Sequence, residues 1–213
     1  MSRSATPAAV ILGIAGTTLA PEEAALFRRH RPAGAILFAR NVADPAQLRS
    51  LTASLREVLG AEAPILVDQE GGRVARLRPP HWPAFPPGAR FEGRPEVALE
   101  NAALLGATCM EMGLDVVCAP VLDLRHPGAH DVIGDRAFSE NPAEVARIGA
   151  AWIAGLRAAG CDVVLHCPGI LAENAALLEA CPRLSDRAAE RMEEARATAL
   201  ASRRPLGAVS ASV

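Results

Sequence analysis

The chain has 213 residues, of which 50% are hydrophobic and 22% are charged, so it can bury a sizeable core and is not disordered by composition. Its formal net charge is −2, and without a basic excess we expect no nucleic-acid partner. No apolar run reaches the roughly 18 residues of a membrane span, and the start does not read as a signal peptide. We therefore expect one domain over residues 1–213, in the cytoplasm and without a membrane partner.

Residue types restrict the chemistry further. All 22 basic residues are arginine, which excludes Schiff bases, Ser–Lys dyads and the lysine of a P-loop. The cysteines are odd in number and lack Cys-x-x-Cys spacing, so we expect buried, reduced thiols rather than disulfides or zinc ligands. They are Cys109, Cys118, Cys161, Cys167 and Cys181. The loop residues His126 and His130 have no helix to enforce ligand spacing, so no metal and no other cofactor is predicted.

Short apolar runs alternate with helical patterns. The runs that we expect to be strands are 9–14, 34–38, 64–67, 114–121, 162–165 and 206–209. The expected helices cover 21–29, 45–58, 95–112, 142–159 and 185–201. Asp44 and Asn141 each precede a proline, a typical start of a helix. This alternation predicts parallel strands with right-handed crossovers, in a doubly wound sheet or in most of an eight-stranded barrel, which takes about 250 residues when complete.

The segment 67–76 has the densest polar pattern. A predicted strand ends on Asp68 and Glu70, and two glycines and two arginines follow, the second being Arg76. Asp68 is suited to accept hydrogen bonds from sugar hydroxyls, and Arg76 to hold a second polar edge. A salt-bridge cluster that only rigidifies the turn fits equally well. The proline-rich loop 78–90 is long enough to fold over such a site.

Other candidates lie at later strand ends. Asp123 follows the fourth run, Arg136 lies in the long loop after it, and His166 directly follows the fifth run. In parallel α/β folds these positions share the edge where ligands bind. A capping Asp, a surface Arg and a core His are the plainer interpretations of the same residues.

Together these motifs resemble glycoside hydrolase family 3, most closely the bacterial cytosolic β-N-acetylhexosaminidases that trim N-acetylglucosamine from cell-wall fragments. The matching segments are 34–41, 67–76, 119–123 and 133–136, within a match over about 11–168. The block Asp-Gln-Glu-Gly-Gly-Arg-Val is highly specific to that family. The resemblance implies an α/β fold, an incomplete or divergent TIM-type (β/α) barrel with about six parallel strands.

The resemblance also implies a sugar pocket. Its residues would be Asp68, Arg76, Arg136 and His166. In the family a Lys-His pair at the fifth strand continues the pocket, and here that pair reads Leu165-His166. The implied ligand is an amino sugar or a cell-wall-derived saccharide.

The family's catalytic residues have no counterpart at the matching places. Its Asp-Ser-His, whose His is the acid/base, falls on Ala176, Leu177 and Leu178, and we expect a plain amphipathic helix over 172–180. Its nucleophilic Asp lies on a strand beyond the one that matches 208–213. Because retaining hydrolysis needs a nucleophile and a proton donor, we predict lost or strongly reduced hydrolysis and assign no catalytic residue.

Several interpretations stay open at this point. In one interpretation the chain is a sugar-binding or regulatory pseudoenzyme. In another it is a glycosidase with a replacement acid such as Glu70, Glu173 or Asp123. It is otherwise an interaction protein, with a homo-oligomer covering open edges at the first and sixth strands, or a fragment.

Overall fold

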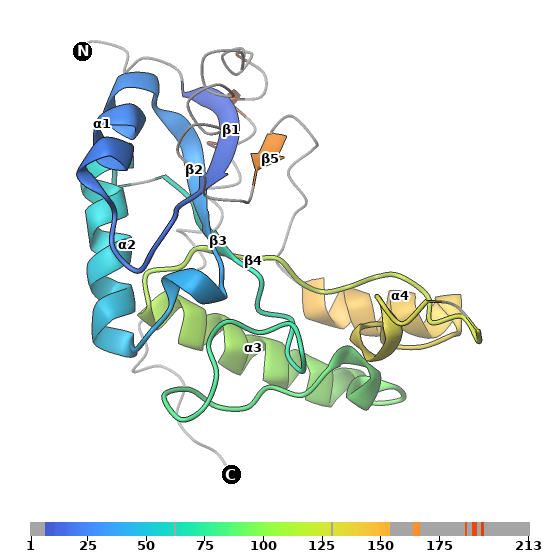
Figure 1. Ribbon diagram of the computed structural model, residues 1–213. Coiled ribbons are helices and arrows are strands. Elements are labelled where there is room, and N and C mark those ends of the chain that lie inside the picture. Colours follow the sequence, from blue (N-terminus) through green and yellow to red (C-terminus); the bar gives the residue numbers. More distant parts are fainter. Residues whose placement is uncertain are drawn as a thin grey trace.

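A single parallel sheet organises the computed structural model, in the strand order β4-β3-β2-β1-β5 (Figure 1). The structure describes residues 7–61, 63–128, 130–153, 164–166, 186, 189–190 and 193. The strands are β1 (Ala8–Gly13), β2 (Pro32–Leu37), β3 (Ile65–Val67), β4 (Val116–Val117) and β5 (Val164–His166). The predicted α/β fold with parallel strands is confirmed for these segments, and the run 206–209 lies outside the described residues.

Within the described ranges, four α-helices lie between these strands, together with three short 3-10 turns. The helices are α1 (Pro21–His30), α2 (Pro45–Leu59), α3 (Pro95–Glu111) and α4 (Pro142–Ile153), and the turns are η1 (Ala39–Asn41), η2 (Gly88–Phe91) and η3 (Gly134–Arg136). Each α-helix begins with proline, whose missing N–H costs nothing there. The Asp44 carboxylate caps α2, accepting hydrogen bonds from the backbone N–H groups of Ala46 and Gln47, both at 2.9 Å. The segments 172–180 and 185–201 lie outside the described residues, apart from a few isolated helical positions.

The core lies between the sheet and the helices. Leu48, Leu51 and Leu55 form the buried stripe of α2, and none is more than 2% exposed. The indole of Trp152 on α4 packs against the rings of Phe91 and Phe138, with ring centroids 5.6 and 5.7 Å apart. Figure 1 shows α1 and α2 side by side, while α3 and α4 form a second helical layer. Within the described chain, no helix has both the length and the apolar character needed to cross a bilayer.

One strand is shorter than its apolar run predicts. The run 114–121 suggests a strand of eight residues, but only Val116–Val117 forms a ladder with β3. The Cys118 N–H still donates to the Val67 carbonyl at 2.8 Å, and the chain then leaves the sheet before Pro120. Proline has no N–H for a ladder, so the strand cannot continue through it.

The place of β5 corrects the sequence analysis. The sequence predicted open edges at the first and sixth strands. Instead β5 pairs in parallel with β1, with Val164 opposite Val10 and His166 opposite Leu12. In a closed barrel of parallel strands the neighbour of the first strand is the last one, so β5 takes the place of a closing strand. The predicted open edge at β1 is therefore wrong, while the predicted homo-oligomer stays a prediction.

The end of the sheet where β3 and β4 begin is held by one arginine. Arg56 donates from Nη2 to the Asp115 carboxylate at 2.7 Å and to the Gly113 carbonyl at 2.8 Å. The same Asp115 oxygen accepts the Ile65 N–H at 3.0 Å. These contacts serve stability, because ligand sites of parallel α/β folds lie at the opposite edge.

Two of the five cysteines, Cys109 and Cys118, lie in the part of the chain that the structure describes, and Cys109 is a free thiol. Cys109 is buried, and burial raises the pKa of its thiol to about 12. This thiol stays protonated at neutral pH and packs as a small apolar side chain.

Gly113 offers a test of the packing between α2 and α3. It has a φ of +77°, and a Cβ there would lie 2.7 Å from Thr52 Oγ1, whose hydroxyl donates to the Met112 carbonyl at 2.9 Å. Gly93 has nearly the same φ, +75°, with nothing within 4 Å of its Cβ position. Gly113→Ala should lower the free energy of unfolding by about 2–5 kcal/mol, because overpacking adds to left-handed backbone strain.

Gly93→Ala should lower the free energy of unfolding by only about 1–2 kcal/mol, the cost of the backbone strain alone. Urea unfolding of both variants measures the difference. Equal losses would contradict the packing of Thr52 against Gly113.

Candidate functional site

The loops after β1 and β2 are joined by a buried asparagine. Asn41 donates from Nδ2 to the carbonyls of Ile14 and Gly16, at 3.1 and 2.8 Å, and its Oδ1 accepts the Phe38 N–H at 2.8 Å. Arg40 adds a bond from Nε to the Ile14 carbonyl at 2.9 Å. One side of the carboxyl edge of the sheet is thereby fixed, with the Phe38 ring beside it.

The turn after β3 is built around the buried side chain of Gln69. Its Oε1 accepts the N–H groups of Arg76 and Leu77 at 2.7 and 3.0 Å, and its Nε2 donates to the Leu77 carbonyl at 3.0 Å. A backbone bridge between Gly71 and Val74 tightens the same turn. The hydrogen bonds of Gln69 therefore fix the backbone positions from which the side chains of Asp68 and Arg76 project.

The proline-rich loop 78–90 packs on this turn. The Phe85 carbonyl accepts the Gly72 N–H at 2.8 Å. Gly71 has a φ of +100°, and a Cβ there would collide with the Pro86 carbonyl oxygen. The glycine pair is needed because the loop backbone approaches so closely.

The first ion pair of the site joins Asp68 and Arg76. Arg76 Nη2 lies 2.8 Å from Asp68 Oδ2, and the side chains are 18% and 25% exposed. The guanidinium carbon lies 5.9 Å from the centroid of the Phe38 ring. Arg76 Nε is buried and has no hydrogen-bond partner among the described residues.

The second ion pair joins Glu70 and Arg136, which are far apart in sequence. Arg136 donates from Nε and Nη2 to the two carboxylate oxygens of Glu70, each at 2.7 Å, and from Nη1 to the Val132 carbonyl at 3.0 Å. The side chain of Arg136 is 23% exposed and that of Glu70 is 12% exposed. The hydrogen bond from Glu70 raises the pKa of Arg136 above its usual range, burial opposes this, and the charges of Glu70, Asp123 and Asp68 add to the rise.

Arg73 makes a further link between the β3 turn and the long loop after β4. Its Nη2 donates to the carbonyls of Asp131, Val132 and Ile133. Its guanidinium also lies 3.6 Å from the Asp131 carboxylate and 3.3 Å from that of Asp135. Arg73 is the arginine of the block Asp-Gln-Glu-Gly-Gly-Arg-Val, but its partners could not be predicted, because they lie about sixty positions later.

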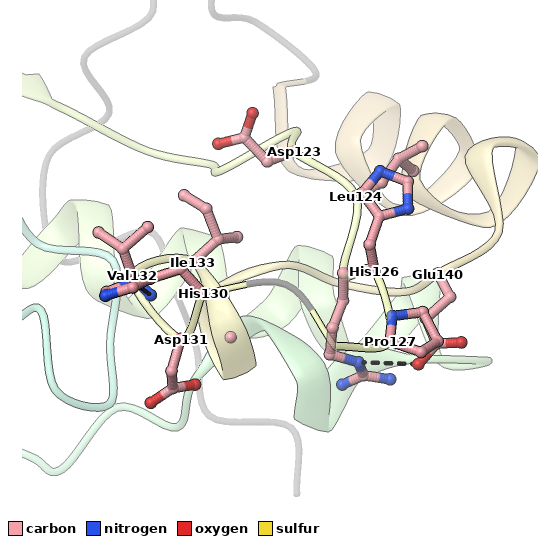
Figure 2. A pocket seen from close by; sticks show the side chains of 11 residues that line it. Asp123, Leu124, His126, Pro127, His130, Asp131, Val132, Ile133 and Glu140 are labelled. Atoms are coloured by element: carbon pink, nitrogen blue, oxygen red, sulfur yellow. Dashed lines mark hydrogen bonds and ion pairs between the residues drawn. The ribbon is translucent and has the colours of Figure 1, made fainter.

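A pocket of about 600 Å³ lies along the same long loop (Figure 2). It is lined by Asp123, Leu124, Arg125, His126, Pro127, His130, Asp131, Val132, Ile133, Gly134 and Glu140. Asp123 borders it on one side, and Glu140, paired with Arg125 at 3.6 Å, borders it on another. The described residues contain no group of three or more His, Cys, Asp or Glu side chains placed to hold a metal.

Comparison with known proteins identifies the family. The model of the "Glycosyl hydrolase family 3 N terminal domain" matches residues 10–186. The chain belongs to glycosyl hydrolase family 3. The predicted family is thereby confirmed, together with the α/β fold class.

Similar proteins of this family are known from several bacteria. Beta-hexosaminidases of Xylella fastidiosa (strain M23) and Alkalilimnicola ehrlichii are 41% and 39% identical over 169 and 168 residues, which is 75% of this chain and 50% and 48% of theirs. NagZ of Neisseria gonorrhoeae, solved with N-trifluoroacetyl-D-glucosamine, matches with a TM-score of 0.64 and 31% identity over 69% of this chain and 45% of its own. A family 3 β-N-acetylglucosaminidase of Paenibacillus matches with a TM-score of 0.63 and 31% identity, over 68% of this chain and 29% of its own. The chain thus spans about half the length of the curated relatives it matches.

The structure brings three of the four predicted pocket residues of this family 3 domain together. Asp68 and Arg76 form an ion pair, and both Asp68 and Glu70 act on Arg136. His166 lies level with Leu12, one residue before the end of β1, and so at the same edge of the sheet.

The structure also bears on the residues predicted as possible replacements for the missing acid. Both oxygens of Glu70 accept hydrogen bonds from Arg136, so the predicted alternative in which Glu70 replaces the acid is disfavoured. Glu173 and the segment 176–178 lie outside the described residues.

The turn around Gln69 predicts a specific loss of stability. Gln69→Leu should lower the free energy of unfolding by about 2–4 kcal/mol, because the N–H groups of Arg76 and Leu77 lose their acceptor in a dry site. Gln47→Leu is the matched control, since Gln47 also makes three side-chain bonds, to Ala43, Thr17 and Asn41, but in a more exposed place.

Water replaces the bonds of Gln47, so that control should cost only about 1 kcal/mol. Urea unfolding compares the two variants. A loss at Gln69 no larger than at Gln47 would show that Gln69 does not hold the turn.

Proposed function

We propose that this family 3 domain binds an amino sugar, such as the N-acetylglucosamine of a cell-wall-derived saccharide, and that its glycoside hydrolysis is lost or strongly reduced. The observation that carries the binding is the pairing of Asp68 with Arg76 and of Glu70 with Arg136 on one turn at the carboxyl edge of the sheet. Asp68, Arg76 and Arg136 are the proposed contacts, with His166 as a fourth at the same edge.

The chemistry of these groups suits sugar hydroxyls. A carboxylate accepts from hydroxyls through either oxygen, and Asp68 is a quarter exposed while Arg76 uses its Oδ2. The buried Nε of Arg76 supplies a donor without a partner in the described part of the chain. Donors and acceptors held side by side recognise adjacent hydroxyls, which both donate and accept.

The proposed loss of hydrolysis rests on residues, not on the fold. The family resemblance places its acid/base motif on Ala176, Leu177 and Leu178, which cannot transfer protons. Glu70 is engaged by Arg136 and is a poor substitute. Loss of a positioned acid/base alone typically slows a reaction by about 10²–10⁴-fold.

The comparisons support the sugar class of the ligand. Curated relatives carry the name beta-hexosaminidase, and the NagZ structure holds N-trifluoroacetyl-D-glucosamine. A cytoplasmic location belongs to the same proposal, supported by the free, buried thiol of Cys109.

Ligand-observed NMR with an aryl β-N-acetylglucosaminide tests both parts in one sample. We expect saturation transfer to the ligand without appearance of product. Asp68→Asn should weaken binding at least about tenfold, because a charge-assisted acceptor is lost. Glu111→Gln is the control, since Glu111 also pairs with an arginine, Arg49 at 3.4 Å, but at an exposed place on α3.

Each result has a clear meaning. Product formed at enzyme-like rates would overturn the proposed loss of hydrolysis. A folded sample without saturation transfer would overturn sugar binding, and equal weakening by both substitutions would remove Asp68 from the site.

A further inference from the structure

Arg136 is held so that only part of its guanidinium is free for a ligand. The group has five N–H donors in a rigid plane. Three of them are engaged, two by Glu70 at 2.7 Å each and one by the Val132 carbonyl at 3.0 Å. Two donors, one on Nη1 and one on Nη2, have no partner among the described residues, and their directions are fixed because the guanidinium plane is held on both sides.

The charge of this guanidinium is compensated at short range. Glu70 is only 12% exposed and forms a two-bond pair with Arg136, which water screens weakly. The carboxylates of Asp68 and Asp123 also act on Arg136. Glu70 offsets the charge of Arg136, and Arg76 offsets that of Asp68, so an anionic group at the remaining donors of Arg136 would meet the uncompensated charge of Asp123.

The other arginines of this edge do not reverse that balance. Arg76 is paired with Asp68, and Arg73 lies between the carboxylates of Asp131 and Asp135. Arg40 lies over the Phe38 ring, 4.8 Å from its centroid, and donates to the Ile14 carbonyl on the β1 side.

We infer that Glu70 is a specificity-determining residue, which positions Arg136 as a donor to hydroxyl groups and makes the site reject anionic sugars. The ligand class is therefore an uncharged saccharide. This inference rests on the proposed sugar-binding function and deepens it. Glu70 acts through Arg136 and is not itself a catalytic residue.

A second glutamate provides a matched control. Glu92 also holds the long loop after β4, through Arg125 at 3.3 Å and through the Ser139 hydroxyl. It is not among the carboxylates that act on Arg136. Glu70→Gln and Glu92→Gln therefore both loosen the loop, but only the first changes the charge around Arg136.

The test compares N-acetylglucosamine with its 6-phosphate by calorimetric or NMR titration at one ionic strength. The wild-type chain should prefer the uncharged sugar by at least about tenfold, as expected for one unscreened like charge at short range. Glu70→Gln should lower the ratio of the affinity for the uncharged sugar to that for the 6-phosphate about tenfold. Glu92→Gln should leave this ratio unchanged. A purely structural role of Glu70 would weaken both ligands equally and leave the ratio unchanged.

The outcomes separate this inference from the function on which it rests. If the wild type binds neither sugar, the proposed function fails and the inference with it. If it binds the uncharged sugar but also binds the phosphate equally, or if folded Glu70→Gln keeps the wild-type ratio, only the inference fails.

A measurement on the wild type covers the case of an unfolded variant. Raising the salt from about 0.05 M to about 0.5 M should improve the affinity for the 6-phosphate relative to the uncharged sugar, because screening weakens repulsion. A relative loss of affinity for the phosphate would overturn the inference.

Discussion

The ion pair between Glu70 and Arg136 connects the two segments that form the candidate site. Glu70 belongs to the turn after β3, and Arg136 to η3 in the long loop after β4. The turn is ordered locally by Gln69, and Arg73 also links it to the loop, but the Glu70–Arg136 pair is the more buried of the two connections. Removing one partner of such a pair leaves an uncompensated charge. The orientation of Arg136 therefore depends on Glu70.

The pairing of β5 with β1 determines how the sheet compares with a closed barrel. A strand beside β1 occupies the closing position of a barrel, whereas β4 stands at the other end of the described sheet. This arrangement places His166 next to the loop after β1 rather than next to the loop after β4. The resemblance to a fifth-strand Lys-His pair is therefore weakened by the topology, and the position of His166 at the carboxyl edge is what supports a role for it.

Much of the fold was predictable because its signals are local. A proline at the first position starts α2 and α4, after Asp44 and Asn141 respectively, and a single apolar stripe decides the buried face of α2. The clustering of Asp68 and Arg76 was also predictable, since Arg76 follows Asp68 by eight positions and two glycines between them allow a tight turn. The partner of β5 was not, because a short apolar run does not encode which neighbour it meets.

The pairing of Arg136 with Glu70 was equally inaccessible, since it spans 66 positions and depends on two loop conformations. The identity of the family came instead from the polar block around Asp68, which no general physical rule singles out.

The central claim is that a sugar binds between Arg76 and Arg136, and arginine Nε–H NMR tests it most directly. The chain has no lysine, so its basic side chains all report in one arginine spectrum, with Arg76 and Arg136 assigned by substitution to lysine. Added N-acetylglucosamine should shift the Nε–H signals of these two residues, with Arg76 shifting most because its buried donor gains a partner. Shifts confined to other arginines, or an unchanged spectrum at saturating sugar, would contradict the account.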